Sequence, residues 1–322
     1  MKRYFVTGGA GFIGAHLTEK LLSIGGRVTV YDNFSNGQKW HFKNCQNNPN
    51  LRIIEADVRD ESSLNEAIKK HDVVFHLASN ADIARAAFDP DIDFSNGTLL
   101  TRCVLEAMRN NDVKRIVFTS GSGVYGDVPA DYIHEDYDKM IPVSTYGAQK
   151  LASESLIAAY SFMFDMHGIV FRFANVVGAH QTHGVAYDFL RRLAKNPLQL
   201  KILGDGTQSK PYVHIDDVLE AFLLIENEEK VGYEYFNVSS SDSLTVKEIA
   251  DIACERMGLL NTRYDFTGGN RGWKADVPLY RLNTDKLRAR GWVCERNSKE
   301  AVDSAIQSMI KDIKAGNIPV SD

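Results

Sequence analysis

The stretch Tyr4–Gly14, near the start of the chain, limits the possible folds more than any other part of the sequence. An apolar run at Tyr4–Val6 predicts a buried strand, and apolar residues with helical spacing follow from Phe12 onward. A strand, a glycine-rich turn and a helix form the opening of a dinucleotide-binding unit, because the turn is tight and the backbone must come close to a pyrophosphate. The helix N-terminus then offers N–H groups and partial positive charge to the phosphates. We therefore predict cofactor contacts from five residues of this stretch: Gly8, Gly11, Phe12, Ile13 and Gly14.

Asp32 lies at the end of a second predicted strand, Arg27–Tyr31, about 20 residues beyond the glycines. An acid at this place accepts hydrogen bonds from the adenosine ribose hydroxyls and repels a 2′-phosphate, so it favours NAD over NADP. Alternatively, Asp32 opens a turn together with Asn33. We predict that the cofactor is NAD and that Asp32 and Asn33 both contact it.

The composition argues against several classes of partner. The 322 residues carry a net charge of −5 without a basic run, so a nucleic-acid surface is not expected. No apolar stretch approaches the roughly 18 residues of a membrane span, and residues 1–30 lack the cleavage pattern of a signal peptide. The four cysteines are far apart and form no CxxC pair, so a zinc site is not expected either. We expect a cytoplasmic protein that binds no nucleic acid, membrane or metal.

Strands and helices alternate through the first half of the chain. Apolar runs predict strands at residues 51–55, 72–76, 115–120 and 168–173, and helical patterns cover about 90–111 and 145–167. This alternation predicts an α/β fold with a Rossmann-type, doubly wound parallel sheet, whose ligands bind at the carboxyl ends of the strands. Asp57 follows one of these strands, where it either meets the adenine amino group or caps a helix over residues 61–70.

The rhythm of the sequence changes after about residue 175. Helical patterns recur at 184–195, 215–226, 245–258 and 298–315, with short strands and loops between them. We interpret residues 1–175 as an NAD-binding domain and residues 176–322 as a smaller, mixed α/β, substrate-binding domain. No Gly-, Ser- or Pro-rich linker separates the two, so this boundary is soft and single strands or helices can cross it.

Tyr146 and Lys150 are four residues apart in the predicted helix 145–167, so their side chains share one face. An ammonium group near a phenol stabilises the phenolate, which predicts a pKa for Tyr146 lowered from about 10 toward neutrality. Such a tyrosine can take a proton from a sugar hydroxyl while hydride leaves the same carbon, and the lysine can donate to the nicotinamide ribose. The same spacing also occurs on ordinary surface helices. Here it follows a dinucleotide-binding opening and a strand that ends in Ser120–Ser122.

Taken together, these pieces resemble an extended short-chain dehydrogenase/reductase of the nucleotide-sugar epimerase/dehydratase branch. The resemblance runs from residue 3 to residue 280. It rests on the segments TGGAGFIG (7–14), YDN (31–33), HLA (76–78), GVYGD (123–127), YGAQK (146–150), RFANVVG (172–178), GDGTQ (204–208) and GGNRGW (268–273). These motifs are highly specific for the family and poorly specific for the substrate.

The resemblance implies an NAD-dependent enzyme that first oxidises a nucleoside-diphosphate sugar at C4, with Tyr146 as the base and Lys150 as its partner. Arg271 matches a diphosphate-binding arginine, which suits bidentate phosphate recognition, although it can also be a solvated loop cation. Further cofactor contacts are implied for Asp57, Val58, Leu77, Ala78, Ser79, Asn96 and Ser120, and further substrate contacts for Asn175, Val185 and Lys210.

Three positions depart from the family pattern. The family places Ser or Thr three residues before Val-Tyr-Gly, and here that residue is Gly121; Ser122 beside it is the catalytic hydroxyl that could substitute. The dehydratases carry an Asp-Glu pair directly after that position, and here the pair is Ser122-Gly123, which cannot transfer protons usefully. A family arginine is replaced by Lys210, which keeps the charge but loses the fork geometry.

The function that the resemblance favours is an NAD-dependent nucleotide-sugar 4-epimerase, in which hydride returns to the other face of a 4-keto intermediate. Because Gly121 has no hydroxyl, the alternative is a 4-dehydrogenase that releases the keto sugar. A 4,6-dehydratase and a non-catalytic, dinucleotide-binding regulator are disfavoured, the latter because Tyr146 and Lys150 are both present. The family also implies a homodimer that pairs through the helices at about 90–111 and 145–167.

Overall fold

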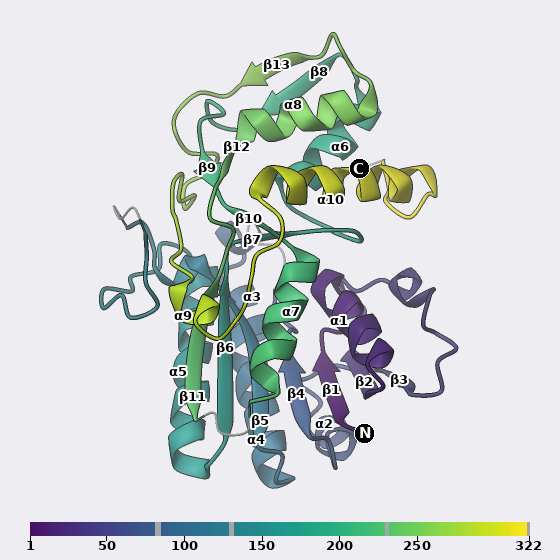
Figure 1. Ribbon diagram of the computed structural model, residues 1–322, viewed down its shortest axis with the longest axis vertical. Coiled ribbons are helices and arrows are strands. Elements are labelled where there is room, and N and C mark those ends of the chain that lie inside the picture. The colour runs from purple at the N-terminus through teal and green to yellow at the C-terminus, as the bar shows by residue number, and fades with distance from the viewer. Residues whose placement is uncertain (81–84, 129–131, 229–231, 321–322) are drawn as a thin grey trace. The chain divides into compact units, whose positions relative to one another are not determined.

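The computed structural model describes residues 1–322 except 81–84, 129–131, 229–231 and 321–322 (Figure 1). The chain divides into two compact units. Unit 1 consists of Met1–Gly126, Asp138–Phe173 and Leu219–Phe236, and unit 2 consists of Asp127–Tyr137, Ala174–Val218 and Asn237–Asp322. The main division therefore falls next to the expected residue 175, but one later segment returns to unit 1 and one earlier segment joins unit 2.

Unit 1 is built on a seven-stranded sheet with the order β11-β6-β5-β4-β1-β2-β3. The pairs that join β1 to β6 are all parallel, which confirms the predicted parallel sheet. The order reverses between β1 and β4, and in such sheets ligands bind outside the carboxyl ends of the strands at this switch point. The strands are β1 (Arg3–Thr7), β2 (Arg27–Asp32), β3 (Leu51–Glu55), β4 (Val73–His76), β5 (Arg115–Gly121), β6 (His167–Phe173) and β11 (Tyr233–Val238).

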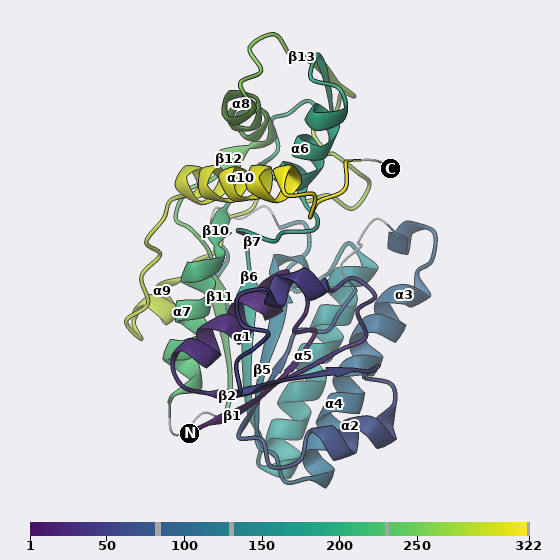
Figure 2. The ribbon, with the colours of Figure 1, turned by 90° about the vertical axis from the view of Figure 1, so that its right-hand side faces the viewer.

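Helices cover both faces of this sheet, so it is doubly wound as predicted (Figure 2). One face carries α1 (Phe12–Ser23) and α7 (Ile215–Glu226), and the other carries α2 (Glu61–Ala67), α4 (Leu99–Asn110) and α5 (Thr145–Phe164). Neighbouring residues of strand β4 point to opposite faces of the sheet, and both pack against helices. Phe75 packs on Phe222 of α7 with ring centroids 5.6 Å apart, whereas Val74 belongs to the core cluster under α4.

The helix predicted over about 90–111 is interrupted. The structure has a short α3 (Asp91–Asp93), a π turn (Phe94–Thr98) and only then α4. Inside the π turn, Asn96 has non-helical dihedral angles (φ −106°, ψ 24°). A Cβ on Gly97 would collide with the side chain of Gln149 in α5, so the Gln149 side chain occupies the space that Gly97 leaves. Wide turns of this kind are frequent at functional sites.

Unit 2 is a mixed α/β unit. Its six short strands form three two-stranded sheets, β10–β7, β12–β9 and β13–β8. A separate apolar core lies among α6, α8 and α10, and reciprocal capping boxes fix the starts of α8 and α10. The elements are β7 (Asn175–Val177), α6 (Val185–Lys195), β8 (Gln199–Ile202), β9 (Ser209–Lys210), β10 (Tyr212–His214), β12 (Leu244–Thr245), α8 (Val246–Met257), β13 (Arg263–Phe266), α9 (Asp285–Arg288) and α10 (Ser298–Lys314).

Two further findings concern the part of the chain that the structure describes. No helix there combines the length and the apolar character that a membrane span requires. Nor do three or more His, Cys, Asp or Glu side chains come together there in a group that could hold a metal ion.

Candidate active site

The glycine-rich turn between β1 and α1 is shaped by close backbone contacts. Gly8 has a positive φ of 68°, and a Cβ on it would lie 2.6 Å from the backbone nitrogen of Ala78, beyond the end of β4. A Cβ on Gly14 would collide with the carbonyl oxygen of Gly8. At Gly11, by contrast, the nearest atom to an added Cβ is the Gly8 carbonyl oxygen at 3.3 Å. Gly8 and Gly14 are therefore required by packing, and at Gly11 an added Cβ would make a tight contact without a collision.

The start of α1 suits an anion. The N-cap residue that precedes Phe12 is Gly11, no side chain caps the helix, and its first turn holds no acidic residue. The helix dipole and the N–H groups of the first turn are thus left for a ligand. Together with the turn that no side chain can fill, this arrangement fits the pyrophosphate of a dinucleotide.

Asp32 ends β2 and is tied into the same turn. Its Oδ2 accepts a hydrogen bond from the backbone N–H of Ala10 at 2.9 Å, and its Oδ1 accepts one from the N–H of Phe34 at 2.8 Å. Burial raises the pKa of this carboxyl, and the two N–H donors oppose that rise. Asp32 therefore does open a turn, and the same contact with Ala10 places its carboxylate beside the glycine-rich loop.

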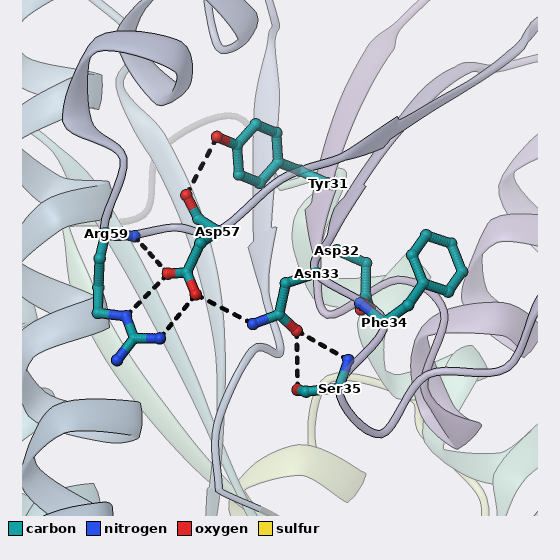
Figure 3. Close-up of polar contacts among 7 residues, drawn as sticks. All are labelled: Tyr31, Asp32, Asn33, Phe34, Ser35, Asp57 and Arg59. Carbon is teal, nitrogen blue, oxygen red and sulfur yellow. Dashed lines mark hydrogen bonds and ion pairs between the residues drawn. The ribbon is translucent and has the colours of Figure 1, made fainter.

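Asp57 forms a polar cluster with Asn33 and Arg59 at the ends of β2 and β3 (Figure 3). Its carboxylate accepts hydrogen bonds from Asn33 Nδ2 at 3.1 Å and from Arg59 Nε and Nη2 at 2.9 and 2.7 Å. The Arg59 guanidinium holds the pKa of Asp57 well below its usual range. The helix α2 is capped by Asp60, whose Oδ1 accepts from Ser63 N–H. The alternative that Asp57 caps this helix was therefore wrong, and its adenine contact remains a prediction.

The other predicted cofactor residues lie at the ends of neighbouring elements. Leu77 and Ala78 continue β4, with Leu77 N–H bonded to the Thr7 carbonyl at 3.1 Å, and Val58 is buried. The Ser79 hydroxyl accepts from Gln149 Nε2 at 3.3 Å, and the Asn96 carbonyl accepts from the N–H of Asn80 at 2.8 Å.

Tyr146 and Lys150 share one face of α5, as the spacing predicts. The Lys150 Nζ lies 5.6 Å from the centroid of the Tyr146 ring and donates to the Thr119 carbonyl at 2.8 Å. Burial lowers the pKa of Lys150 to about 7 and raises that of Tyr146 to about 12, with the Asp93 carboxylate adding to the latter rise. The expected lowering of the Tyr146 pKa is thus wrong for the chain by itself. Desolvation of the phenol is the largest effect on the Tyr146 pKa, and it outweighs the support that a neighbouring ammonium group gives to the phenolate.

The segment from Ser120 to Gly123 carries the departures from the family pattern. The Ser120 side chain is buried, and its Oγ has no hydrogen-bond partner among the described residues. A Cβ on Gly121 would meet only the Phe173 carbonyl oxygen, at 3.8 Å. Ser122 begins a short 3₁₀ turn to Val124, and a side chain on Gly147 would collide with the Gly123 carbonyl. The segment therefore packs tightly on α5, yet leaves room at position 121.

Unit 2 brings together the two cations predicted to bind the substrate. Lys210 Nζ lies 2.5 Å from Asp276 Oδ1, and Arg271 Nη1 donates to the Asp276 carbonyl at 2.6 Å. Arg271 also forms an ion pair with Asp127. Asn175 donates through Nδ2 to the Tyr280 hydroxyl at 3.2 Å. Val185, at the start of α6, instead packs against the hydrophobic core of unit 2.

Sequence reasoning missed two acids beside the Tyr146–Lys150 pair. Asp93 is 1% exposed, and its carboxylate accepts from Asn80 Nδ2 at 2.8 Å and from Thr145 Oγ1 at 2.7 Å. Glu154 is buried on α5. Its position four residues beyond Lys150 was a usable signal, because that spacing puts the two on one helix face. Nothing in the sequence pattern singles out Asp93.

Comparison with known proteins places the chain in a family. The model of the NAD-dependent epimerase/dehydratase family matches residues 4–239. The chain belongs to this family. A UDP-glucose 4-epimerase of Mycolicibacterium smegmatis is 32% identical over 253 residues, 77% of this chain and 80% of the relative.

Two further similarities bear on the kind of reaction. A UDP-N-acetyl-alpha-D-glucosaminuronate decarboxylase of Bacillus cytotoxicus is 32% identical over 259 residues, 77% of this chain and 78% of the relative. The crystal structure of a UDP-galactose 4-epimerase is 35% identical, with a TM-score of 0.86 over 97% of this chain and 99% of that chain. This member of the family is accordingly an NAD-dependent enzyme of nucleotide-sugar chemistry. Unit 1 has the open turn, the uncapped helix start and the carboxylate at β2 that fit NAD.

Proposed function

We propose that this enzyme is a UDP-sugar 4-epimerase. The observation that carries the proposal is the Tyr146–Lys150 pair on one face of α5, in a chain whose relatives include proteins named as UDP-glucose and UDP-galactose 4-epimerases. The uridine nucleotide is inferred from those relatives, because none of the described residues identifies a base by itself.

In this proposal, the residues of the chain bind the substrate and move one proton. Bound NAD would supply the acceptor and donor of the C4 hydride, and the residues of the glycine-rich turn together with Asp32 would hold it. Tyr146 takes the proton of the C4 hydroxyl. It gives the proton back after the 4-keto sugar has rotated and presents its opposite face. Lys150 keeps positive charge beside the phenol, which favours phenolate and opposes the effect of burial. Arg271, Lys210 and Asn175 hold the diphosphate and orient the sugar.

Position 121 decides between this proposal and its alternative. A family hydroxyl at this place would share the C4 proton, and here Gly121 leaves space instead. We infer that either Ser122 or a water molecule completes the proton path. If neither does, the enzyme would release the keto sugar as a 4-dehydrogenase. A 4,6-dehydratase stays disfavoured, because Ser122 and Gly123 offer no carboxylate.

We further expect a homodimer in the cytoplasm, with α4 and α5 of each copy in the interface. Two large apolar side chains near the end of α5, Phe162 and Met163, are 80% and 71% exposed, which suits a surface that a second copy covers. Light scattering at micromolar concentration would show twice the 36.0 kDa of one chain, and a monomer would contradict this expectation.

The experiment that tests the function is proton NMR of UDP-sugars with the purified enzyme and a trace of NAD. Inversion at C4 beyond the amount of NAD supports the epimerase, whereas keto sugar formed only up to that amount supports the dehydrogenase. The variant Tyr146→Phe should abolish turnover, because the phenol hydroxyl is the only group that the proposal uses as a base. Tyr132→Phe, at an exposed tyrosine of unit 2, is the matched control and should retain it.

A further inference from the structure

Unit 1 buries a complete ion pair on the same helix as Tyr146 and Lys150. The side chains of Glu154 and Arg172 are only 2% and 3% exposed. Arg172 Nε lies 3.1 Å from both carboxylate oxygens, and Nη2 lies 2.7 Å from Oε2. Buried ion pairs contribute little net stability, because desolvation of both charges offsets their attraction. Stability alone is therefore a weak reason for this pair.

The pair reaches the segment that carries the departures from the family pattern. Arg172 Nη1 donates to the Tyr125 hydroxyl at 2.9 Å, and the guanidinium lies 5.1 Å from the centroid of the Tyr125 ring. Tyr125 directly follows the 3₁₀ turn Ser122–Val124, and its N–H bonds to the Ser122 carbonyl at 3.1 Å. Glu154 thus holds, through one arginine, the turn that packs on the start of α5.

The same carboxylate influences Lys150, one helical turn away. Burial favours the neutral amine of Lys150, and the charges of Glu154 and Asp93 favour its ammonium form, with Glu154 the larger of the two. His76 of β4 also faces Lys150, and burial with the lysine charge lowers the pKa of His76 to about 3, so it stays neutral. Tyr146 lies beside Lys150 on the same helix, and it is neutral near pH 7.

We propose that Glu154 is a positioning residue for the Tyr146–Lys150 pair. It keeps negative charge next to Lys150, so that the lysine remains an ammonium, and it holds Tyr125 and its turn against α5 through Arg172. This inference rests on the proposed function only for its kinetic consequence, because the effect on Lys150 exists without substrate.

The first test is Glu154→Gln. Loss of the carboxylate lowers the pKa of Lys150, so the phenolate of Tyr146 loses support and forms at higher pH. The acid limb of the kcat profile should move up by about one pH unit, which corresponds to about tenfold lower kcat on that limb. KM for the nucleotide sugar should change much less than kcat. A more exposed pair offers a matched control: Glu106 accepts hydrogen bonds from Arg109 and from the Tyr160 hydroxyl and is not part of the Tyr146–Lys150 cluster, so Glu106→Gln should leave the profile unchanged.

A double variant distinguishes a positioning role of the Glu154–Arg172 pair from a purely structural role. Glu154→Leu combined with Arg172→Met removes both buried charges, and such replacements often keep or raise stability. The proposal expects a melting temperature near that of the wild type, with the acid limb still displaced. A double variant with the wild-type profile would overturn it, since the pair would then be purely structural.

A titration without substrate tests the role of Glu154 independently of the proposed 4-epimerase function. The side-chain nitrogen of Lys150 can be followed by NMR in protein labelled with ¹⁵N-lysine, with Lys150→Met to assign the signal. In Glu154→Gln the signal should titrate at lower pH than in the wild type, and an unchanged titration would overturn the proposal. If the shift occurs while the wild type converts no nucleotide sugar, the proposed function fails and the role of Glu154 stands.

Discussion

The glycine-rich turn and the segment Ser120–Gly123 both lie at carboxyl ends of strands in unit 1, yet they are constrained in opposite ways. At the turn, a methyl group on Gly8 or Gly14 would collide with backbone atoms. At Gly121, a methyl group would meet one carbonyl oxygen at 3.8 Å. The first region is fixed by packing, so its sequence follows from the fold. In the second region position 121 is free in packing terms, so packing alone does not dictate the residue there.

The largest effect should come from Gly14→Ala, which breaks the packed region. The added Cβ has only backbone atoms to displace, Gly8 O and Gly9 Cα, so the turn must open. NAD affinity measured by calorimetry should fall by about a hundredfold, the loss of a few charge-assisted hydrogen bonds. Gly232→Ala, where an added Cβ meets nothing within 4 Å, is the control. Unchanged NAD affinity in Gly14→Ala would contradict the packing argument.

A smaller effect is expected for Asp32→Asn at the same region. The amide oxygen can still accept one hydrogen bond, but the negative charge that repels a 2′-phosphate is lost. Affinity for NAD should fall by about tenfold, and the preference for NAD over NADP should narrow by a similar factor. Parallel titrations with both dinucleotides measure this. A variant that loses NAD affinity while still rejecting NADP would show that Asp32 acts only through the turn.

The spare room at position 121 can be tested with a variant that is expected to gain activity. Gly121→Ser places a hydroxyl where the packing leaves room, so the fold should be kept and C4 inversion should rise by about fivefold, a modest acid–base contribution. Turnover by NMR and the melting temperature test the two parts. Ser122→Ala is the companion variant: a large loss of turnover there, with no gain in Gly121→Ser, would mean that Ser122 already supplies the hydroxyl.

The smallest effect is predicted in unit 2, where the Arg271–Asp127 pair is 38% and 40% exposed. Exposed pairs contribute at most about 1 kcal/mol. Asp127→Asn should therefore tighten UDP binding by only about threefold, because it frees the guanidinium for the diphosphate. Asp303→Asn, which breaks the Arg256–Asp303 surface pair of the same unit, should leave UDP affinity as it is. Weaker UDP binding in Asp127→Asn would mean that Asp127 positions Arg271 and does not compete with the ligand.

Much of unit 1 could be predicted because its signals are local. The apolar strand at Tyr4–Val6, the glycine spacing and the acid at position 32 each depend on neighbours in sequence. The interruption at Asn96 was not predicted, because the apolar spacing over 90–111 is that of one continuous helix, and the packing of Gly97 beside Gln149 of another helix is not visible in the sequence. The predicted lowering of the Tyr146 pKa was wrong for the same reason: the spacing to Lys150 is visible in the sequence, whereas the desolvation of the phenol is not.

In the candidate site, too, features that depend on local sequence were predicted and contacts between distant residues were not. The predicted cofactor residues that follow strands lie at the carboxyl edge of the sheet as expected, because a parallel sheet brings these strand ends to one edge; that they bind the cofactor stays a prediction. The partners of Lys210 and Arg271 were not predicted, because Asp276 and Asp127 are 66 and 144 residues away from them in sequence. Asp57 was predicted either to cap the helix that became α2 or to contact the adenine. The cap of α2 is Asp60, three residues further along the chain.

The most direct test of the central claim follows a deuterium atom at C4 of the UDP-sugar, with NAD far below the sugar concentration. If the enzyme is a 4-epimerase that returns the same hydride, the inverted product keeps the deuterium at C4 and forms in excess over NAD. Inverted product that has exchanged its deuterium for solvent hydrogen would contradict the claim. So would a keto sugar that accumulates only to the level of NAD.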